Sequence, residues 1–345
     1  MHRVWNADRT KAALYAHAGP DVEGGVVLSG HSDVVPVDGQ AWTSDPWTVT
    51  ERDGRLYGRG TCDMKGFVAL AVAALPLALG KGVKRPLQLA LSYDEELGCT
   101  GAPPMIAAMA RGLPRASAVI VGEPSRMGVV TGHKGGTGFK VHVKGYEVHS
   151  SLVHTGVSAV MASAPVIDWA NRMNAANAAA QATPIAALFN PPFTTLHVGM
   201  IEGGTAHNIT AGDCHFVFEF RVVPGEDIEE WVRRFQAEVA QVEGGMKAIR
   251  AETGIALDRY FSIPPLRPEE NGAAEALARR LTGDNATRVV SYGTEAGQFQ
   301  AEGYSAVVCG PGDIAQAHQA DEYLETSEFE AGWAFMQRLV GELAK

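Results

Sequence analysis

Short apolar runs alternate with helical stretches along the first third of the chain. Runs rich in Val, Leu and Ile, bounded by Gly or Pro, predict buried strands at 24–30, 86–94 and 116–124. The segment 64–79 is apolar nearly all round, which predicts a helix packed against a sheet. This strand–helix–strand order indicates an α/β domain whose sheet is mostly parallel.

The pattern changes in the middle of the chain. Segments 139–145, 194–204 and 214–225 alternate in polarity, as half-exposed antiparallel strands do, and helices are predicted around 157–181 and 226–243. After about residue 250 the first pattern returns, with the predicted order helix 268–281, strand 287–292, strand 305–309 and helix 326–344. We therefore expect an α/β domain formed by 1–134 and 250–345, with an α+β domain inserted at 135–249.

Composition narrows the classes of protein that fit. A length of 345 residues is enough for two domains with their own cores, and the net charge of -10 argues against nucleic acid or an anionic membrane as a partner. No segment reads as a membrane span or a secretory signal. The four cysteines are scattered without a CxxC pair, which suggests neither a disulfide frame nor a zinc knuckle and fits a reducing cytoplasm.

The ends of the predicted α/β strands share one property: each is followed by side chains that can bind a cation. In chain order these are His31 and Asp33, Asp63 at the start of the helix, Glu95 and Glu96, Glu123, and His318. In open α/β sheets, ligands bind in the crevice at the carboxyl ends of the strands. The repetition of this feature around one rim predicts a binding site there.

The residue types at this rim indicate which ligand they bind. Histidine nitrogen with carboxylate oxygen and no thiolate is the donor set of catalytic zinc or a related divalent ion. A cation would also relieve the repulsion within the acidic triplet 94–96. Because the set exceeds the needs of one tetrahedral ion, we expect two ions, roughly 3.5–4 Å apart, that share a bridging carboxylate.

The motifs "GHSDVVP", "GRGTCDMKG", "SYDEELG", "VGEPS" and "AHQADEYLE" resemble, in order and over nearly the whole chain, the M20 family of di-zinc amidohydrolases and peptidases. The resemblance implies a zinc-exopeptidase-like catalytic domain with a mostly parallel mixed sheet, plus an inserted α+β dimerisation (lid) domain. It also implies two divalent ions, Zn²⁺ or alternatively Co²⁺. His31 and Glu123 would hold one ion, Glu96 and His318 the other, and Asp63 would bridge them.

The resemblance assigns further roles around these ligands. Asp33 would hydrogen-bond the far nitrogen of His31, and Glu95 would be the general base for a bridging hydroxide. His149 in the inserted domain would reach the active site of a partner subunit and stabilise an oxyanion. Substrate contacts are expected from Asn208, Arg221, Thr294 and Glu295.

Structural interpretations compete with several of these roles. His149 could be an ordinary surface histidine, and Arg221 could pair with a neighbouring acid on an exposed strand. The cysteines are expected to be small buried hydrophobes. We interpret six further histidines as residues that are solvated or hydrogen-bonded within the protein, and not as ligands. They are His133, His142, His154, His197, His207 and His215.

Within the family, "GHSDVVPVDGQAW", "YGTEAG" and "GPGDIAQAHQADEYLE" are most similar to the acetylornithine deacetylase branch. The implied reaction is cytoplasmic hydrolysis of N²-acetyl-L-ornithine to ornithine and acetate, a step of arginine biosynthesis, by a homodimer joined through the inserted domain. Succinyl-diaminopimelate desuccinylase, aminoacylase and carboxypeptidase activities of the same family are alternatives. A non-catalytic metal-binding relative is a remote alternative, disfavoured by the presence of Glu95.

The chain departs from the family at its start. Family members carry some tens of residues, including a helix that covers the sheet, before the first strand, whereas this chain begins within an early strand. We therefore expect an uncovered sheet face, which is an aggregation liability.

Overall fold

The computed structural model describes residues 1–345 and divides into two compact units. The first unit comprises Met1–His133 with Leu266–Lys345, and the second unit comprises Lys134–Pro265. Each unit has its own hydrophobic core, so each is described by itself.

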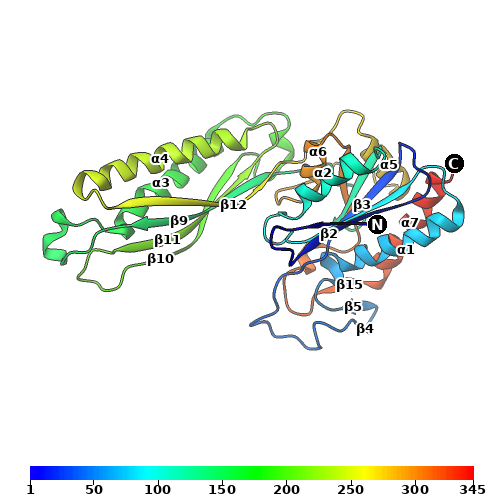
Figure 1. Ribbon diagram of the computed structural model, residues 1–345, viewed down its shortest axis with the longest axis horizontal. Coiled ribbons are helices and arrows are strands. Elements are labelled where there is room, and N and C mark those ends of the chain that lie inside the picture. Colours follow the sequence, from blue (N-terminus) through cyan, green and yellow to red (C-terminus); the bar gives the residue numbers. More distant parts are fainter. The chain divides into compact units, whose positions relative to one another are not determined.

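The first unit is built on a six-stranded mixed sheet with the strand order β1–β2–β6–β3–β7–β14 (Figure 1). Strands β6, β3, β7 and β14 are parallel, whereas β2 is antiparallel to both of its neighbours. The bounds are β1 His2–Trp5, β2 Ala12–Ala18, β3 Val26–His31, β6 Leu87–Ser92, β7 Ala118–Pro124 and β14 Ala306–Gly310. The predicted mostly parallel α/β sheet is confirmed.

Helices cover both faces of this sheet, which explains why its central strands are apolar throughout rather than alternating. One face packs against α1 Gly66–Lys81, α5 Ala273–Thr282 and α7 Thr326–Leu343. The other packs against α2 Ala102–Gly112 and α6 Ala296–Ala301. Successive residues of β3 therefore enter different cores: Val26 and Leu28 face α1, and Val27 faces α2.

The stretch Thr61–Lys81, which contains α1, is long and apolar enough to cross a membrane by length and composition alone. In the structure its residues Phe67, Leu70 and Ala74 are buried in the same core as Phe335 and Leu339 of α7. We therefore assign α1 as the core helix of the first unit. It ends at Gly82, whose φ of 62° is the left-handed conformation that glycine adopts readily after a helix.

The central strands of the six-stranded sheet are covered, and its exposed positions lie at the β1 edge. β3 is buried at every position and β6 at all but one. β1 is exposed at three of its four positions, with Trp5 44% exposed, and α1 also carries exposed apolar side chains, with Val72 at 45% and Leu79 at 64%. The central strands are covered because helices pack on both faces, whereas β1 is an edge strand that pairs only with β2.

Two smaller sheets complete the first unit. One has the order β15–β5–β4, with β4 Thr50–Arg52, β5 Arg55–Tyr57 and β15 Tyr323–Glu325. The other pairs β8 Gly132–His133 with β13 Val289–Val290. The first of these sheets joins the segment before Asp63 to the segment after His318, which are distant in sequence.

The second unit is a four-stranded antiparallel sheet with the order β10–β11–β9–β12 and two helices packed on one face (Figure 1). The bounds are β9 Gly135–Lys144, α3 Ala159–Ala179, β10 Thr195–Gly203, β11 Asp213–Val222, α4 Ile228–Ile249 and β12 Gly254–Ile263. Residues of β11 alternate between the buried face and the other face of the sheet. α4 begins at Asp227, whose carboxylate accepts the N–H of Glu229 at 2.9 Å and caps the helix.

The second boundary of the inserted segment differs from the expected position near residue 250. The second unit extends to Pro265, because β12 pairs with β9 along its whole length. The polarity of β12 was too irregular for it to be predicted as a strand, so its residues were assigned to the wrong unit.

Candidate metal centre

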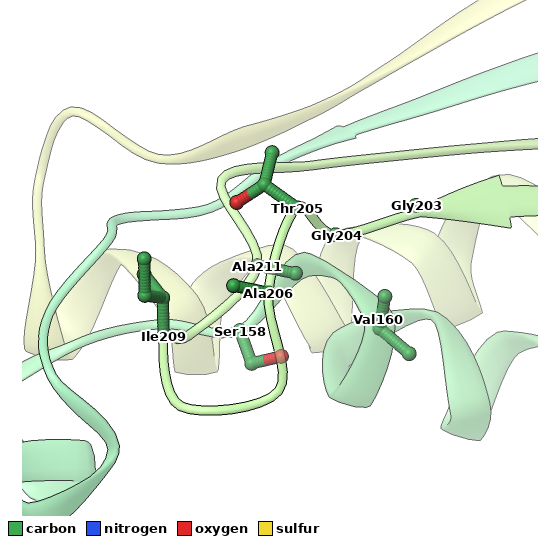
Figure 2. Close-up of a pocket in the computed structure, with 8 residues that line it drawn as sticks. All are labelled: Ser158, Val160, Gly203, Gly204, Thr205, Ala206, Ile209 and Ala211. Carbon is green, nitrogen blue, oxygen red and sulfur yellow. The ribbon is translucent and has the colours of Figure 1, made fainter.

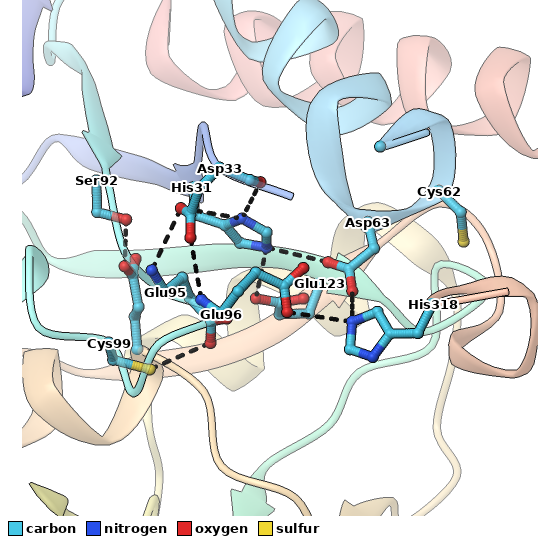
Figure 3. A network of polar contacts seen from close by, with 12 residues as sticks. His31, Asp33, Cys62, Asp63, Ser92, Glu95, Glu96, Cys99, Glu123 and His318 are labelled. Atoms are coloured by element: carbon cyan, nitrogen blue, oxygen red, sulfur yellow. Dashed lines mark hydrogen bonds and ion pairs between the residues drawn. The ribbon is translucent and has the colours of Figure 1, made fainter. Parts of the chain in front are cut away.

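The predicted ligands of the first unit gather at the carboxyl ends of its parallel strands (Figure 3). His31 is the last residue of β3, Glu123 lies near the end of β7, and Glu95 and Glu96 follow β6. Asp63 precedes α1, and His318 lies in the loop after β14. The five elements therefore bring their polar side chains to one rim of the sheet.

Asp63 lies between the two histidines. Its Oδ1 is 3.0 Å from His31 Nε2, and its Oδ2 is 3.1 Å from His318 Nε2. Asp63 is buried, with 5% of its surface exposed. A carboxylate that turns one oxygen to each of two histidines has the geometry to bridge two cations.

Each histidine also has a second carboxylate beside it. His318 Nε2 is 3.1 Å from Glu96 Oε2, and His31 Nε2 is 3.7 Å from Glu123 Oε1. The groups His31–Asp63–Glu96 and His31–Glu95–Glu123 each keep their ligand atoms within 4.8 Å of one another. The distances place His318 beside Glu96 and His31 beside Glu123, whereas the group His31–Asp63–Glu96 spans both pairs.

A tight turn brings both glutamates to the same site. Asp94 has a φ of 55° in the left-handed region, which reverses the chain directly after β6, and its carboxylate pairs with Lys11 at 2.6 Å. The N–H groups of Glu95 and Glu96 then donate to Asp33 Oδ1 and Oδ2 at 3.2 and 3.1 Å. Asp33 therefore orients the backbone from which both glutamates extend.

The expected contact between the Asp33 carboxylate and His31 is corrected by this geometry. His31 Nδ1 lies 2.9 Å from the backbone oxygen of Asp33, whereas the carboxylate oxygen is 3.6 Å away. The carboxylate is occupied by the two glutamate N–H groups instead. Because a carbonyl oxygen only accepts hydrogen bonds, Nδ1 of His31 carries a hydrogen and Nε2 faces the carboxylates.

Burial and crowding shift the protonation of this cluster strongly. Although burial favours the neutral ring of His31, the Asp33 and Asp63 carboxylates raise its pKa well above the usual value. Contacts with Asp63 and Glu96 raise the pKa of His318 to about 10. Burial raises the pKa of Glu95 to about 8 and that of Glu123 well above the ordinary range. Without a cation, such a cluster keeps protons that free side chains would release.

The cluster also contains buried oxygen atoms that accept no hydrogen bond. Glu96 Oε1 and Glu123 Oε1 are buried and accept no hydrogen bond within the protein. Leaving a buried polar atom unsatisfied is costly, and a carboxylate oxygen can only be satisfied by a donor or a cation. Two histidine nitrogens and these carboxylate oxygens therefore fit a pair of divalent cations.

The Glu95 carboxylate accepts a hydrogen bond from a buried cysteine. Cys99 Sγ donates to Glu95 Oε1 at 3.1 Å, and Cys99 is fully buried. All four cysteines are buried, as expected, and the Cys99 thiol in addition makes this hydrogen bond.

Thr294 and Glu295, for which substrate contacts are predicted, are buried behind the cluster. Both are 1% exposed. The Glu295 carboxylate accepts hydrogen bonds from Ser92 and Ser29, and Thr294 Oγ1 accepts the N–H of Ala296 at the start of α6. Their polar atoms are therefore used within the protein, behind the rim of β3 and β6.

A buried ion pair supports the bridging residue, and sequence reasoning missed it. The Glu322 carboxylate accepts the N–H groups of Gly60, Cys62 and Asp63 at 2.9–3.0 Å. It also accepts Arg59 Nη1 at 2.6 Å, and both side chains are 1% exposed. Glu322 therefore fixes the backbone from which Asp63 extends.

The same network reaches the loop of His318. Arg59 Nη2 donates to Gln40 Oε1 at 2.5 Å, and Gln40 Nε2 donates to the backbone oxygen of His318 at 3.1 Å. His318 has a φ of 64°, which is uncommon for a residue other than glycine. Arg59 and Glu322 lie within the motifs quoted for Asp63 and His318, but nothing in one sequence indicates that they are buried together.

Of the site residues predicted for the second unit, His149 and Asn208 are exposed and Arg221 is half-buried. His149 precedes a short helical turn, and its Nδ1 accepts the N–H of Ser151 at 3.2 Å. The backbone oxygen of Asn208 accepts the N–H of Ser150 at 2.8 Å, so the His149 and Asn208 segments are neighbours. Arg221 lies on β11, 3.5 Å from Glu219, which is the pairing with a neighbouring acid considered as its alternative.

The loop that carries Asn208 folds over the start of α3 and borders a pocket (Figure 2). The backbone oxygen of Ala211 accepts the N–H of Ala159 at 2.8 Å, which fixes the end of this loop on the helix. The pocket is lined by Ser158, Val160, Gly203, Gly204, Thr205, Ala206, Ile209 and Ala211.

Comparisons with known proteins give a consistent result. Residues 27–342 match the model of peptidase family M20/M25/M40. An acetylornithine deacetylase of Myxococcus xanthus is 37% identical over 322 residues, which cover 91% of this chain and 79% of the relative. A second acetylornithine deacetylase, from Pasteurella multocida, is 31% identical over 97% of this chain and 84% of the relative.

Solved structures with a similar fold are more distant in sequence. An M20 family metallo-carboxypeptidase from Sulfolobus solfataricus has a TM-score of 0.79 at 18% identity, covering 96% of this chain and 88% of that one. The aminopeptidase PepT of Bacillus cereus has a TM-score of 0.72 at 17% identity, covering 100% of this chain and 89% of that one. These two likenesses concern the fold alone.

Proposed function

We propose that this chain, which belongs to peptidase family M20/M25/M40, hydrolyses the amide bond of N²-acetyl-L-ornithine with the help of two divalent cations. Family membership and two relatives named acetylornithine deacetylase indicate a metallohydrolase that acts on amides. The acetylated substrate is proposed because both of these relatives carry that name. We propose Zn²⁺ as the ion, with Co²⁺ as a substitute, because the donor set is nitrogen and oxygen without sulfur.

The observation that supports cation binding most directly is the pair of buried oxygen atoms that accept no hydrogen bond, on Glu96 and Glu123. We assign His31 and Glu123 to one ion, Glu96 and His318 to the other, and Asp63 to both. The contacts of 3.0 and 3.1 Å between Asp63 and the two histidines support this division. When bound, the ions polarise the substrate carbonyl and lower the pKa of water.

Glu95 is proposed as the group that moves the proton. Its pKa is raised to about 8 by burial, and neighbouring positive charge would bring it back toward the ionised form. An ionised Glu95 can take the proton from the attacking water and return it to the departing amine. The contact with Cys99 at 3.1 Å supports this role by fixing one of the two carboxylate oxygens.

We further propose that two copies of the chain pair through β10 and the start of α3. β10 is an edge strand that pairs only with β11, and an open edge is a template for another strand. Met200 and Ile201 on β10 are 72% and 52% exposed, and Met161 of α3 is 68% exposed. Antiparallel pairing of two identical edges is self-complementary about a two-fold axis, as a homodimer requires.

In such a dimer we propose that His149 donates to the oxyanion in the partner's site. Its Nδ1 accepts a backbone N–H, so its Nε2 carries the hydrogen and points outward as a donor. Asn208 and Arg221 are proposed to contact the substrate carboxylate, for which a guanidinium group is the fitting partner. The four free cysteines agree with a cytoplasmic enzyme.

The experiment is a turnover assay of metal-reconstituted protein with acetyl-ornithine, succinyl-diaminopimelate, an acetylated neutral amino acid and a dipeptide. Acetyl-ornithine should give the highest kcat/KM. A higher kcat/KM for another compound would show that acetyl-ornithine is not the preferred substrate. If protein with two bound ions turned over none of the compounds, the proposed enzymatic role would be wrong.

Two variants test the proton transfer. Glu95→Gln should lower kcat by roughly 10²–10⁴-fold and leave the bound metal unchanged. Asp94→Asn is the matched control, because it alters the adjacent acid, whose partner is Lys11, and asparagine tolerates a positive φ. Near-normal kcat in Glu95→Gln would show that another group moves the proton.

A further inference from the structure

The open face of the second unit's sheet carries two histidines side by side. His142 of β9 and His215 of β11 are directly opposite in the antiparallel register. Their rings are stacked, with centroids 4.1 Å apart and planes 11° from parallel. Asp213, two residues before His215 on the same face, places Oδ1 at 2.7 Å from His142 Nε2.

We propose that His142, His215 and Asp213 form a second kind of metal site, which binds one divalent transition-metal ion such as Zn²⁺. The three side chains keep their ligand atoms within 4.8 Å of one another. Two imidazole nitrogens with one carboxylate oxygen are a donor set typical of zinc. This site lies entirely within the second unit and is independent of the function proposed for the first.

The position of these residues in the sheet argues against a packing role. Their neighbours in sequence, such as Val143 and Cys214, point to the opposite face and are fully buried. His142 and His215 therefore contribute nothing to the core of the unit. Their earlier interpretation as merely solvated histidines does not account for their alignment with each other and with an acid.

An ion pair alone explains only part of the arrangement. Contact between His142 and Asp213 satisfies those two side chains but leaves His215 without a role. Ligand atoms around a tetrahedral zinc, each about 2.0–2.2 Å from the ion, are about 3.3 Å apart. The ligand atoms already lie within 4.8 Å of one another on half-buried or exposed side chains, which have room to rotate toward that spacing.

A fourth ligand is available on the next strand. Glu202 of β10 is directly opposite His215, so Glu202, His215 and His142 form a row across three strands. Either this carboxylate or a water molecule would complete the coordination. Lys144, opposite Asp213 on β9, is the nearest competing cation in the register. An ion bound here would join the two central strands of the sheet.

The test is the amount of zinc retained per chain after equilibrium dialysis of the full-length protein against a series of free zinc concentrations, measured by mass spectrometry. Wild-type protein should retain one zinc per chain more than His142→Ala, His215→Ala or Asp213→Asn. His197→Ala is the matched control, because His197 is an exposed histidine of the same sheet that lies opposite Glu219. It should retain as much zinc as the wild type.

A second readout reports the site directly. Zinc should broaden or shift the ring proton signals of His142 and His215 in NMR spectra, and leave those of His197 unchanged. Equal zinc retention in the wild type and the three site variants would overturn the proposal. Equal loss in His197→Ala and His215→Ala would also overturn it, because zinc would then bind surface histidines without selection.

Discussion

The two units bury different kinds of side chain. Beneath the rim of its sheet, the first unit buries carboxylates and histidines, of which Asp63, Glu123 and His31 are at most 5% exposed. The second unit fills the space under its helices with aromatic rings, among them Phe218 and Phe235, both 0% exposed. The two units therefore differ in what stabilises them. The second unit is stabilised by apolar packing, whereas the first unit depends partly on bound cations that neutralise its buried carboxylates.

The largest expected effect tests the aromatic side of this comparison. Phe235 lies 4.4 Å from Phe218 and 5.3 Å from Phe139, measured between ring centroids. Phe235→Ala should destabilise the second unit by about 3–5 kcal/mol, because it removes buried area and leaves a cavity. Hydrogen–deuterium exchange should accelerate in the second unit and stay unchanged in the first.

Leu188→Ala is the control for this substitution, since Leu188 is 45% exposed in the same unit. Its effect should stay within about 0.5 kcal/mol. Equal acceleration of exchange in both units after Phe235→Ala would show that the two cores unfold together. The two units would then not be stabilised separately.

Removing metal tests whether the buried carboxylates of the first unit need a cation for stability. In a His215→Ala background, which leaves only the first unit's cluster, a chelator should destabilise the first unit. If the concentration of free metal before chelation is 100 to 1,000 times Kd, the free energy of unfolding of the first unit should fall by about 2.7–4.1 kcal/mol. Exchange should accelerate at the rim strands β3, β6 and β7, and zinc should restore protection. Unchanged exchange there would mean that the carboxylates are stable without a cation.

A smaller effect is expected from the ion pair beneath Asp63. Glu322→Gln removes the charge that holds Arg59 and three backbone N–H groups, so Asp63 loses its fixed position. Metal affinity, measured by competition with a chelating dye, should fall by about 10–100-fold. Glu325→Gln is the control, because Glu325 pairs with a half-exposed Arg55. If Glu322→Gln changed the metal affinity by less than twofold, Glu322 would not be needed to position Asp63.

The smallest effect concerns the one lysine that is fully buried in the second unit. Burial lowers the pKa of Lys134 to about 8, and its Nζ donates to the backbone oxygens of Pro191 and Phe193 at 2.8 Å. A neutral amine keeps two hydrogens, so both bonds survive deprotonation. The unfolded chain binds the extra proton up to about pH 10.4, so between about pH 8 and pH 10.4 stability should rise with pH.

Urea unfolding at pH 7.5 and 9.5 measures this dependence. The stability of the wild type relative to Lys134→Met should increase by about 2 kcal/mol across the interval, because the unfolded chain binds more protons there and each pKa unit corresponds to about 1.36 kcal/mol. Lys140→Met, which alters an exposed lysine of β9, should leave the pH dependence as in the wild type. A relative stability that falls with pH would contradict the assigned direction.

The sequence allowed much of the first unit to be predicted, because strands buried on both faces are apolar without interruption. β3, β6 and β7 were found within two residues of their ends for this reason. β12 was missed because its polarity does not alternate regularly, and the boundary of the second unit was misplaced with it. Pairing between distant strands decided its structure, and pairing is not visible in local pattern.

At the candidate site, the types of residue were predictable but their supporting contacts were not. The sequence indicates that His31 and Asp33 belong together, yet the backbone oxygen of Asp33, rather than its carboxylate, bonds the ring. Glu322 could not be assigned from sequence, because its burial depends on Arg59, 263 positions away in the chain. Chemistry follows from residue type, whereas these contacts follow from the tertiary fold.

The most direct test of the account is anomalous diffraction from a crystal of the zinc-loaded protein, collected above and below the zinc edge. We expect two strong anomalous peaks at the rim of the first unit's sheet. One should lie beside His31 and Glu123 and the other beside Glu96 and His318, with Asp63 between them. No peak at this rim, in a crystal whose soaking solution saturates zinc binding, would contradict the central claim that these carboxylates are built around a pair of cations.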